Sequence, residues 1–112
     1  MNFIVHRNDW PWGKSMMVIS SRAEACVQLS FEDSNPGVCF LSGLSVLPEQ
    51  RRRGFATEII GVCEQICEQM GVFRIDLNSV LTDYVQEFYK RLGYLPIKEE
   101  NGLMMMYKII KK

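Results

Sequence analysis

Residues 46–57 read Val46-Leu47-Pro48-Glu49-Gln50-Arg51-Arg52-Arg53-Gly54-Phe55-Ala56-Thr57. The stretch passes from an apolar strand, through a proline and a basic turn, into a helical pattern. Backbone N–H groups at a helix start face outward, and the helix dipole places roughly half a positive charge there. Gly54 lets a phosphate approach the backbone closely, and Ala56 leaves the first turn uncrowded. The stretch therefore predicts an anion-binding loop between a strand and a helix.

Length and composition favour one soluble domain over residues 1–112. Hydrophobic residues make up 47% and charged residues 23%, as in ordinary globular proteins. Thirteen basic and thirteen acidic residues cancel, so we expect neither nucleic acid nor a membrane as a partner. With no signal-peptide pattern and no apolar run of spanning length, the expected location is the cytoplasm. The sequence leaves homodimer formation open.

The four cysteines are Cys26, Cys39, Cys63 and Cys67, and His6 is the single histidine. There is no Cys-x-x-Cys pair, so we expect no metal site. Cys63 and Cys67 are four residues apart in a helical pattern, which places them on one face. We expect four free thiols that act as small buried apolar side chains.

The apolar pattern predicts an α+β fold with a mixed, mostly antiparallel twisted sheet and helices packed on it. The expected strands are residues 2–7, 16–19, 25–31, 38–47, 72–78, 94–98 and 103–110, with a loop at residues 8–14. The expected helices run from about residue 54 to 70 and from Thr82 or Asp83 to about Leu92, and they end at Gly71 and Gly93. Residues 16–47 read as an antiparallel meander.

Two motifs together resemble the GNAT superfamily of N-acetyltransferases. Arg51-x-x-Gly54-x-Ala56 resembles its acetyl-CoA pyrophosphate loop, Arg/Gln-x-x-Gly-x-Gly/Ala. The segment Phe88-Tyr89-Lys90-Arg91-Leu92-Gly93-Tyr94 resembles its Phe-Tyr-x-x-x-Gly-Phe block. The resemblance covers residues 38–110 well and residues 1–37 poorly, because family members usually carry two helices after the first strand. We therefore expect a small, N-terminally reduced member of the superfamily.

The resemblance implies an enzyme that uses acetyl-CoA and passes the acetyl group directly to a primary amine of a small molecule or peptide. It implies that backbone groups of Leu44 and Val46 hold the pantetheine arm, and the oxyanion is expected at a backbone N–H near Val46. The residues expected to bind the cofactor are Leu44, Val46, Arg51, Arg52, Arg53, Gly54, Phe55, Ala56, Thr57 and Asn78. Asn78 has an equally plausible alternative role in capping a turn.

Tyr89 matches the family's tyrosine general acid, which protonates the leaving thiolate. A tyrosine has a pKa of about 10 and a thiol about 8.5, so a positioned tyrosine can make this transfer. The alternative is an amphipathic residue with a buried ring and a paired hydroxyl. Tyr84 is a weaker candidate for the acid.

A general base is harder to identify, because the strand before the loop contains no acidic residue. Glu32, Asp33 and Asp76 are candidates, each with an alternative role as a solvated charge or as a partner of Arg74. His6 is a candidate only by residue type. A water chain or bulk solvent is a further route for the proton.

Trp10 and Trp12 either cover the acceptor site or, as we expect, pack in the core. A rival function is a catalytically weak or inactive CoA-binding regulatory or interaction module. The missing strand glutamate and the reduced N-terminal half favour that rival. A nucleic-acid binder is disfavoured by the zero net charge.

Overall fold

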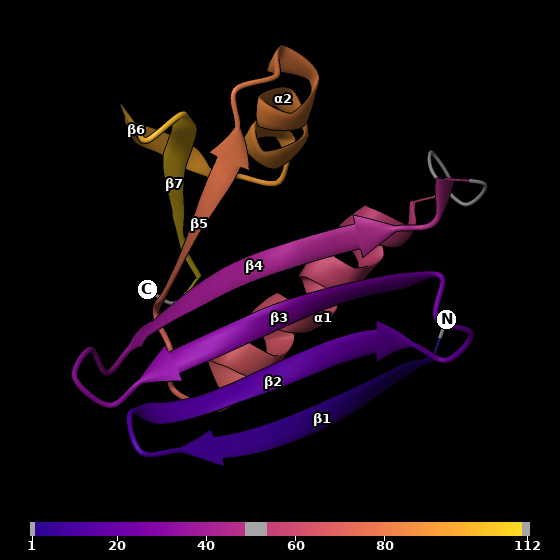
Figure 1. The fold of residues 1–112 in the computed structure, drawn as a ribbon, viewed down its shortest axis with the longest axis vertical. Helices are drawn as coiled ribbons and strands as arrows, with labels where there is room; N and C mark the ends of the chain where they lie inside the picture. The colour runs from indigo at the N-terminus through magenta and orange to yellow at the C-terminus, as the bar shows by residue number, and fades with distance from the viewer. Residues whose placement is uncertain (1, 49–53, 111–112) are drawn as a thin grey trace.

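The structure, a computed structural model, describes residues 2–48 and 54–110. Within these residues seven strands form one sheet in the order β1-β2-β3-β4-β5-β7-β6, and two helices pack against it (Figure 1). The elements are β1 Phe3–Trp10, β2 Gly13–Ser20, β3 Ala25–Glu32, β4 Val38–Val46, α1 Phe55–Gln69, β5 Arg74–Val80, α2 Asp83–Arg91, β6 Leu95–Glu100 and β7 Leu103–Ile109. The predicted α+β class and element order are confirmed. No helix in the described ranges is both long and apolar enough to cross a membrane.

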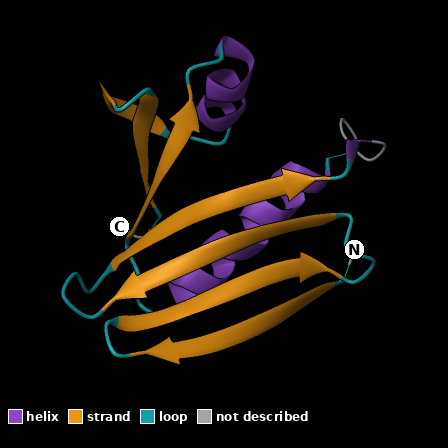
Figure 2. Cartoon of the chain, in the orientation of Figure 1, coloured by secondary structure: helices purple, strands orange, loops and turns teal. Residues whose placement is uncertain are grey.

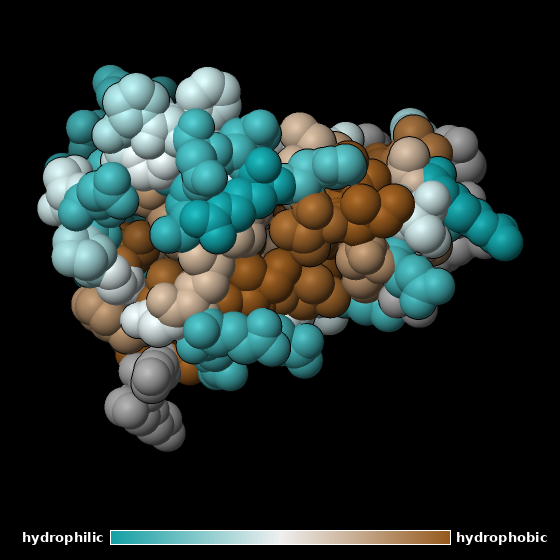
Figure 3. All heavy atoms as spheres, turned by 90° about the horizontal axis from the view of Figure 1, so that it is seen from below, coloured by the Kyte–Doolittle hydropathy of each residue, from teal (hydrophilic) through white to brown (hydrophobic). Residues whose placement is uncertain are grey.

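The expected loop at residues 8–14 is wrong. β1 and β2 pair along their whole length, and only Pro11 and Trp12 form the turn between them. β1 is the edge of the sheet and most of its side chains are exposed, so its sequence lacks the apolar alternation that identifies a half-buried strand. Figure 3 views the molecule from the side of β1 and shows an apolar area bordered by polar side chains.

The core lies between α1 and one face of strands β2 to β4. α1 turns its buried residues Ile59, Ile60, Cys63 and Cys67 toward this face. From β3 and β4 the same core receives alternating residues, Val27 and Leu29 on one strand and Cys39 and Leu41 on the other. The opposite face of these strands carries no helix in the described part of the chain (Figure 2). The predicted antiparallel meander and the predicted first helix are confirmed.

Both helices end at the glycines expected from the sequence. Gly71 and Gly93 follow the two helices with φ of 79° and 97°, a backbone region that glycine adopts without strain. The expected strand at residues 72–78 begins too early, because β5 begins at Arg74 and the preceding Phe73 is 44% exposed. The N–H groups of Phe73 and Arg74 both donate to the Gly37 carbonyl, and the Phe73 ring lies over Gly37, where a Cβ would come within 2.5 Å of it.

β4 and β5 run parallel at one end of their length and then separate. Their pairing extends from Val38 opposite Arg74 to Leu41 opposite Leu77. Beyond this point β5 turns away from β4, toward α2 (Figure 1). The divergence opens the sheet in its middle, at the carboxyl ends of both strands.

A β-bulge lies in β4 beside this opening. Cys26 of β3 lies opposite Ser45, and Gln28 lies opposite Ser42, so β4 uses three residues where β3 uses two. Gly43, within the bulge, has a φ of 65°. A bulge adds twist and re-aims the groups that follow it, and here it turns β4 beside the opening.

Candidate functional site

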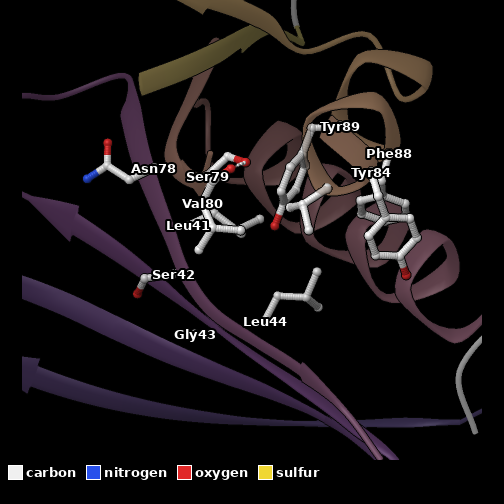
Figure 4. A pocket seen from close by; sticks show the side chains of 11 residues that line it. Leu41, Ser42, Gly43, Leu44, Asn78, Ser79, Val80, Tyr84, Phe88 and Tyr89 are labelled. Atoms are coloured by element: carbon white, nitrogen blue, oxygen red, sulfur yellow. Dashed lines mark hydrogen bonds between the residues drawn. The ribbon is translucent and has the colours of Figure 1, made fainter. Parts of the chain in front are cut away.

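A cavity of about 480 Å³ occupies the opening between β4 and β5. β4 and β5 form two of its walls, and α2 forms the third (Figure 4). Its described lining residues are Leu41, Ser42, Gly43, Leu44, Asn78, Ser79, Val80, Tyr84, Val85, Phe88 and Tyr89. These residues are apolar or neutral, which suits a ligand with an uncharged body.

The β4 wall offers backbone groups as well as side chains. Pairing with β5 ends at Leu41, so from Ser42 to Leu44 the edge of β4 faces the cavity instead of a strand. An extended ligand can add to such an edge through main-chain hydrogen bonds. On the β5 side the Ser79 hydroxyl donates to the Val80 carbonyl at 2.9 Å, so its donor is already in use.

Tyr89 brings a proton donor into the cavity from α2. Its side chain is 7% exposed, and its hydroxyl points toward the wall that carries Leu41 and Leu44 (Figure 4). No described residue forms a hydrogen bond with this hydroxyl. Burial raises the pKa of Tyr89 above its usual value of about 10, so the hydroxyl keeps its proton at neutral pH.

Aromatic rings flank Tyr89 along α2. Phe88 meets it edge-on, with ring centroids 5.1 Å apart. Tyr84, one turn earlier, stands at the cavity's rim with 69% of its surface exposed. Val85, Phe88 and Tyr89 of α2 therefore form a wall of the cavity and also belong to the core or pack against it.

The predicted anion loop lies at the start of α1. Gly54 is the residue before the helix, with a φ of 81° and open space where a Cβ would be. Among the described residues no side chain caps this helix start, and the Glu58 N–H donates to the Gly54 carbonyl at 3.0 Å. The N–H groups of Phe55, Ala56 and Thr57, in the first turn of the helix, therefore have no partner within the helix. Residues 51–53, the predicted basic triplet, lie outside the described part of the chain.

The predicted cofactor residues that the structure describes lie on β4, on β5 and at the start of α1. Leu44, Asn78 and the predicted acid Tyr89 line the cavity. Val46 ends β4, and Gly54 to Thr57 begin α1 beyond it. Residues 49–53, which follow β4 and precede α1 in the sequence, lie outside the described part of the chain.

Sequence reasoning missed most of the remaining cavity wall, namely Leu41, Ser42, Gly43, Ser79, Val80 and Val85. One available signal was Gly43, because a glycine inside a strand pattern often marks a bulge or a close backbone approach. The point where β4 and β5 separate depends on tertiary packing and leaves no such local signal.

The candidate bases lie away from the cavity. Glu32 and Asp33 stand at the turn before β4, and Asp76 forms an ion pair with Arg74, as the alternative for that residue predicts. Glu32 and Asp76 border a separate hollow of about 150 Å³. His6 lies on the exposed edge strand β1. The described lining of the main cavity contains no carboxylate and no imidazole.

The expectation that Trp10 and Trp12 pack in the core is wrong. Both are about half exposed, and their rings stack on one another with centroids 6.3 Å apart. The Trp10 indole N–H donates to the Ser15 hydroxyl at 2.9 Å, which holds the pair against the β1–β2 hairpin. Neither ring lines the cavity.

All four cysteines are free thiols, as predicted. Cys39, Cys63 and Cys67 are buried between β4 and α1. Burial, with smaller contributions from Cys67 and Glu64, raises the pKa of the Cys63 thiol to about 12, which suppresses the reactive thiolate. The described residues contain no group of three or more His, Cys, Asp or Glu arranged to hold a metal ion.

Comparison with known proteins identifies the fold. Three solved N-acetyltransferases match with TM-scores of 0.72–0.73. The PaiA N-acetyltransferase of Thermoplasma acidophilum, in complex with coenzyme A, is 14% identical over 85% of this chain and 59% of that protein. An aminoglycoside 6′-N-acetyltransferase, also with coenzyme A, is 17% identical over 91% and 75% of the two chains. The ribosomal-protein-S18-alanine N-acetyltransferase of Escherichia coli is 14% identical over 88% and 69%.

At these identities the solved structures establish the shared fold, and the sequence itself establishes the family. The model of the acetyltransferase (GNAT) family matches residues 9–94, which is most of the chain. The match includes the cavity-lining parts of β4, β5 and α2, and it runs through the segment that contains the Arg51-x-x-Gly54-x-Ala56 motif. This chain belongs to the acetyltransferase (GNAT) family.

Proposed function

We propose that the protein is an acetyl-CoA-dependent N-acetyltransferase that passes the acetyl group directly to a primary amine of a small molecule or peptide. The observation that carries this proposal is the cavity between the diverging β4 and β5, into which the Tyr89 hydroxyl points without a hydrogen bond to any described residue. Two of the structural neighbours were solved with coenzyme A, which supports the same cosubstrate here.

In this proposal the cofactor follows the path that begins at the cavity and ends at α1. The pantetheine arm lies along the β4 edge near Leu44 and Val46, beside Asn78 of β5. The pyrophosphate lies at Gly54 and the first turn of α1, where backbone N–H groups and the helix dipole favour an anion. Arg51, Arg52 and Arg53 add positive charge to this end of the path.

The reaction needs three events at the thioester. The neutral amine attacks the acetyl carbonyl carbon, and a backbone N–H near Val46 stabilises the resulting oxyanion. The C–S bond then breaks, and the departing thiolate takes the proton of the Tyr89 hydroxyl. The new ammonium-type nitrogen loses its proton to water, and Tyr89 regains one from solvent, so protons balance over the cycle.

A rival proposal is a module that binds CoA without turnover. It is favoured by the absence of a carboxylate or imidazole from the cavity's described lining, because no such group there deprotonates the amine. Both proposals predict that acetyl-CoA binds at the cavity. They differ only in whether an added amine becomes acetylated.

The deciding experiment measures free CoA thiol after acetyl-CoA is mixed with a panel of amines. The panel contains a peptide with a free α-amine, a lysine derivative, a polyamine and an aminoglycoside. Amine-dependent thiol release, with the acetylated amine found by mass spectrometry, supports the enzyme. Tight CoA binding by calorimetry without release for any amine supports the module, and absence of CoA binding contradicts both.

A further inference from the structure

A polar cluster joins α1, the end of α2 and β7 behind the cavity. Glu64 of α1 accepts one hydrogen bond from the Tyr94 hydroxyl at 3.1 Å and another from the Lys108 ammonium at 3.0 Å. Tyr94 is fully buried, whereas Glu64 and Lys108 keep about a quarter or less of their side chains exposed. Hydrogen bonds of this kind, with an ionised partner, are stronger than neutral ones. The cluster therefore fixes the position of the Tyr94 ring from its far end.

Tyr94 in turn contacts Tyr89 in two ways. The two rings meet edge-on at a centroid distance of 5.8 Å. The Tyr94 backbone N–H donates to the Tyr89 carbonyl at 3.0 Å. Lys108 closes the arrangement, with its ammonium 5.7 Å from the centre of the Tyr94 ring. The side chain and the backbone of Tyr94 thus both contact Tyr89, whose hydroxyl points into the cavity.

We propose that Tyr94, Glu64 and Lys108 are positioning residues that set the orientation of the Tyr89 hydroxyl in the cavity. The inference rests on the proposed function, in which that hydroxyl protonates the leaving thiolate. A general acid must lie within hydrogen-bond reach of its acceptor, and small displacements reduce its effect. α2 has only nine residues, so an anchor outside the helix is needed to hold its last turn.

The first test is a double-mutant cycle on turnover. Tyr94→Phe keeps the ring and removes the bond to Glu64. We expect kcat to fall about tenfold with little change in KM for acetyl-CoA, because only the transition-state interaction is disturbed. In a Tyr89→Phe background the same change should cost almost nothing further, since the group it positions is gone. An equal loss in both backgrounds would overturn the proposal.

The second test does not depend on turnover. In protein labelled with ¹³C at the tyrosine ring, Tyr94→Phe or Glu64→Gln should shift or broaden the Tyr89 signal. The signal of Tyr84, which lies at the exposed rim of the cavity, serves as the internal reference. An unmoved Tyr89 signal would overturn the positioning role even if no amine is ever acetylated. Conversely, the Tyr89 signal can shift in these variants while Tyr89→Phe leaves kcat unchanged. That result would support the positioning role of the cluster and would show that Tyr89 is not the general acid.

A matched variant controls for the loss of an ion pair. Glu100→Gln removes the carboxylate that pairs with Lys98 at 2.9 Å on β6, away from the cavity lining. It should leave kcat and the Tyr89 signal unchanged, as a surface pair contributes little. Glu64→Gln is the milder replacement if Tyr94→Phe does not fold, which a melting curve establishes. If Glu100→Gln moves the Tyr89 signal as much as Glu64→Gln does, the inference is contradicted.

Discussion

The ring of Tyr94 meets the ring of Tyr89 edge-on, with 73° between their planes and 5.8 Å between their centroids. The two residues are five apart, and Gly93, with a φ of 97°, turns the chain between them. The Phe-Tyr-x-x-x-Gly-Tyr spacing is therefore a spatial unit. The helix presents Tyr89 to the cavity, and the turn brings the next aromatic ring behind it.

Tyr89→Phe should separate an acid from a packing residue. The change removes one hydroxyl, keeps the ring contacts with Phe88 and Tyr94, and leaves no described partner unsatisfied. We expect kcat to fall roughly a hundredfold or more, with acetyl-CoA affinity and melting temperature nearly unchanged. Steady-state thiol release and a melting curve on the same preparation give both quantities.

Tyr84→Phe is the matched control, because Tyr84 also belongs to α2 and borders the same cavity but is mostly exposed. It should retain a kcat within a fewfold of the parent protein. A Tyr89→Phe protein that is stable, binds acetyl-CoA and turns over at the parent rate ends the general-acid assignment.

The pH dependence of activity should follow the acceptor amine. Because burial raises the pKa of Tyr89 above its usual value, the hydroxyl keeps its proton further into the alkaline range than a free tyrosine does. The described cavity lining holds no base, so kcat/KM should rise until the amine itself is neutral. That rise should end near about pH 8 for a peptide α-amine and continue toward about pH 10 for a lysine side chain.

The measurement is a pair of kcat/KM profiles for these two acceptors. A break at one common pH for both amines would indicate an ionising group on the protein and would contradict this prediction. If instead each profile breaks near the pKa of its own amine, solvent removes the proton.

The buried thiols should destabilise the fold at alkaline pH. Burial raises the pKa of Cys63 to about 12 from a reference value of 9.0, so between these pH values the unfolded chain loses a proton that the folded chain keeps. The stabilisation that the neutral Cys63 thiol gives is fully present below pH 9. Above pH 9 the free energy of unfolding falls by roughly 1 kcal/mol per pH unit. Urea unfolding at pH 8, 9, 10 and 11 should show this decline.

Cys63→Ala should lower stability at pH 8, because it leaves a small cavity, but should make the alkaline decline shallower. Cys26 is half-buried on the other face of the sheet, so Cys26→Ala should not change how steeply the free energy of unfolding falls with pH. If the free energy of unfolding falls equally steeply with pH in Cys63→Ala and in the parent protein, the Cys63 thiol is not the cause of the alkaline decline.

The elements with strong local signals were predictable from the sequence. α1 has an apolar stripe, a glycine at each end and a length that only a helix accommodates, so its bounds follow within a residue or two. β3 alternates cleanly because one face is buried and the other is open. In each case the local sequence pattern agrees with the burial that the fold imposes. The secondary structure could therefore be predicted from the pattern alone.

The predictions failed where the secondary structure depends on tertiary contacts rather than on the local sequence pattern. β1 lies at the sheet edge with both faces open, so polar residues such as Asn8 and Asp9 read as a loop although they are paired to β2. Phe73 belongs to the expected strand at residues 72–78, but it precedes Arg74, the first residue of β5. Within the site, Leu44, Asn78 and Tyr89 were named from the family resemblance, whereas the rest of the wall follows from the divergence of two strands.

Gly54→Glu tests the cofactor loop and has a close control at the other end of the same helix. Gly54 and Gly71 have φ of 81° and 79°, and apart from the neighbouring residues no atom of the described chain lies within 4 Å of where a Cβ would be at either site. The same substitution at either site thus adds the same charge and a similar backbone strain of about 1 kcal/mol or more. Only at Gly54 does the carboxylate enter the expected phosphate cradle at the start of α1.

We therefore expect Gly54→Glu to abolish acetyl-CoA binding, as measured by calorimetric titration of protein shown to be folded by its melting curve. Gly71→Glu should bind with parent affinity, although it should melt at a lower temperature, because a carboxylate at a helix C-terminus opposes the dipole. Backbone strain alone would weaken acetyl-CoA binding equally in both variants. Unchanged affinity in folded Gly54→Glu, or equal loss in both, would show that the phosphates do not lie at the start of α1.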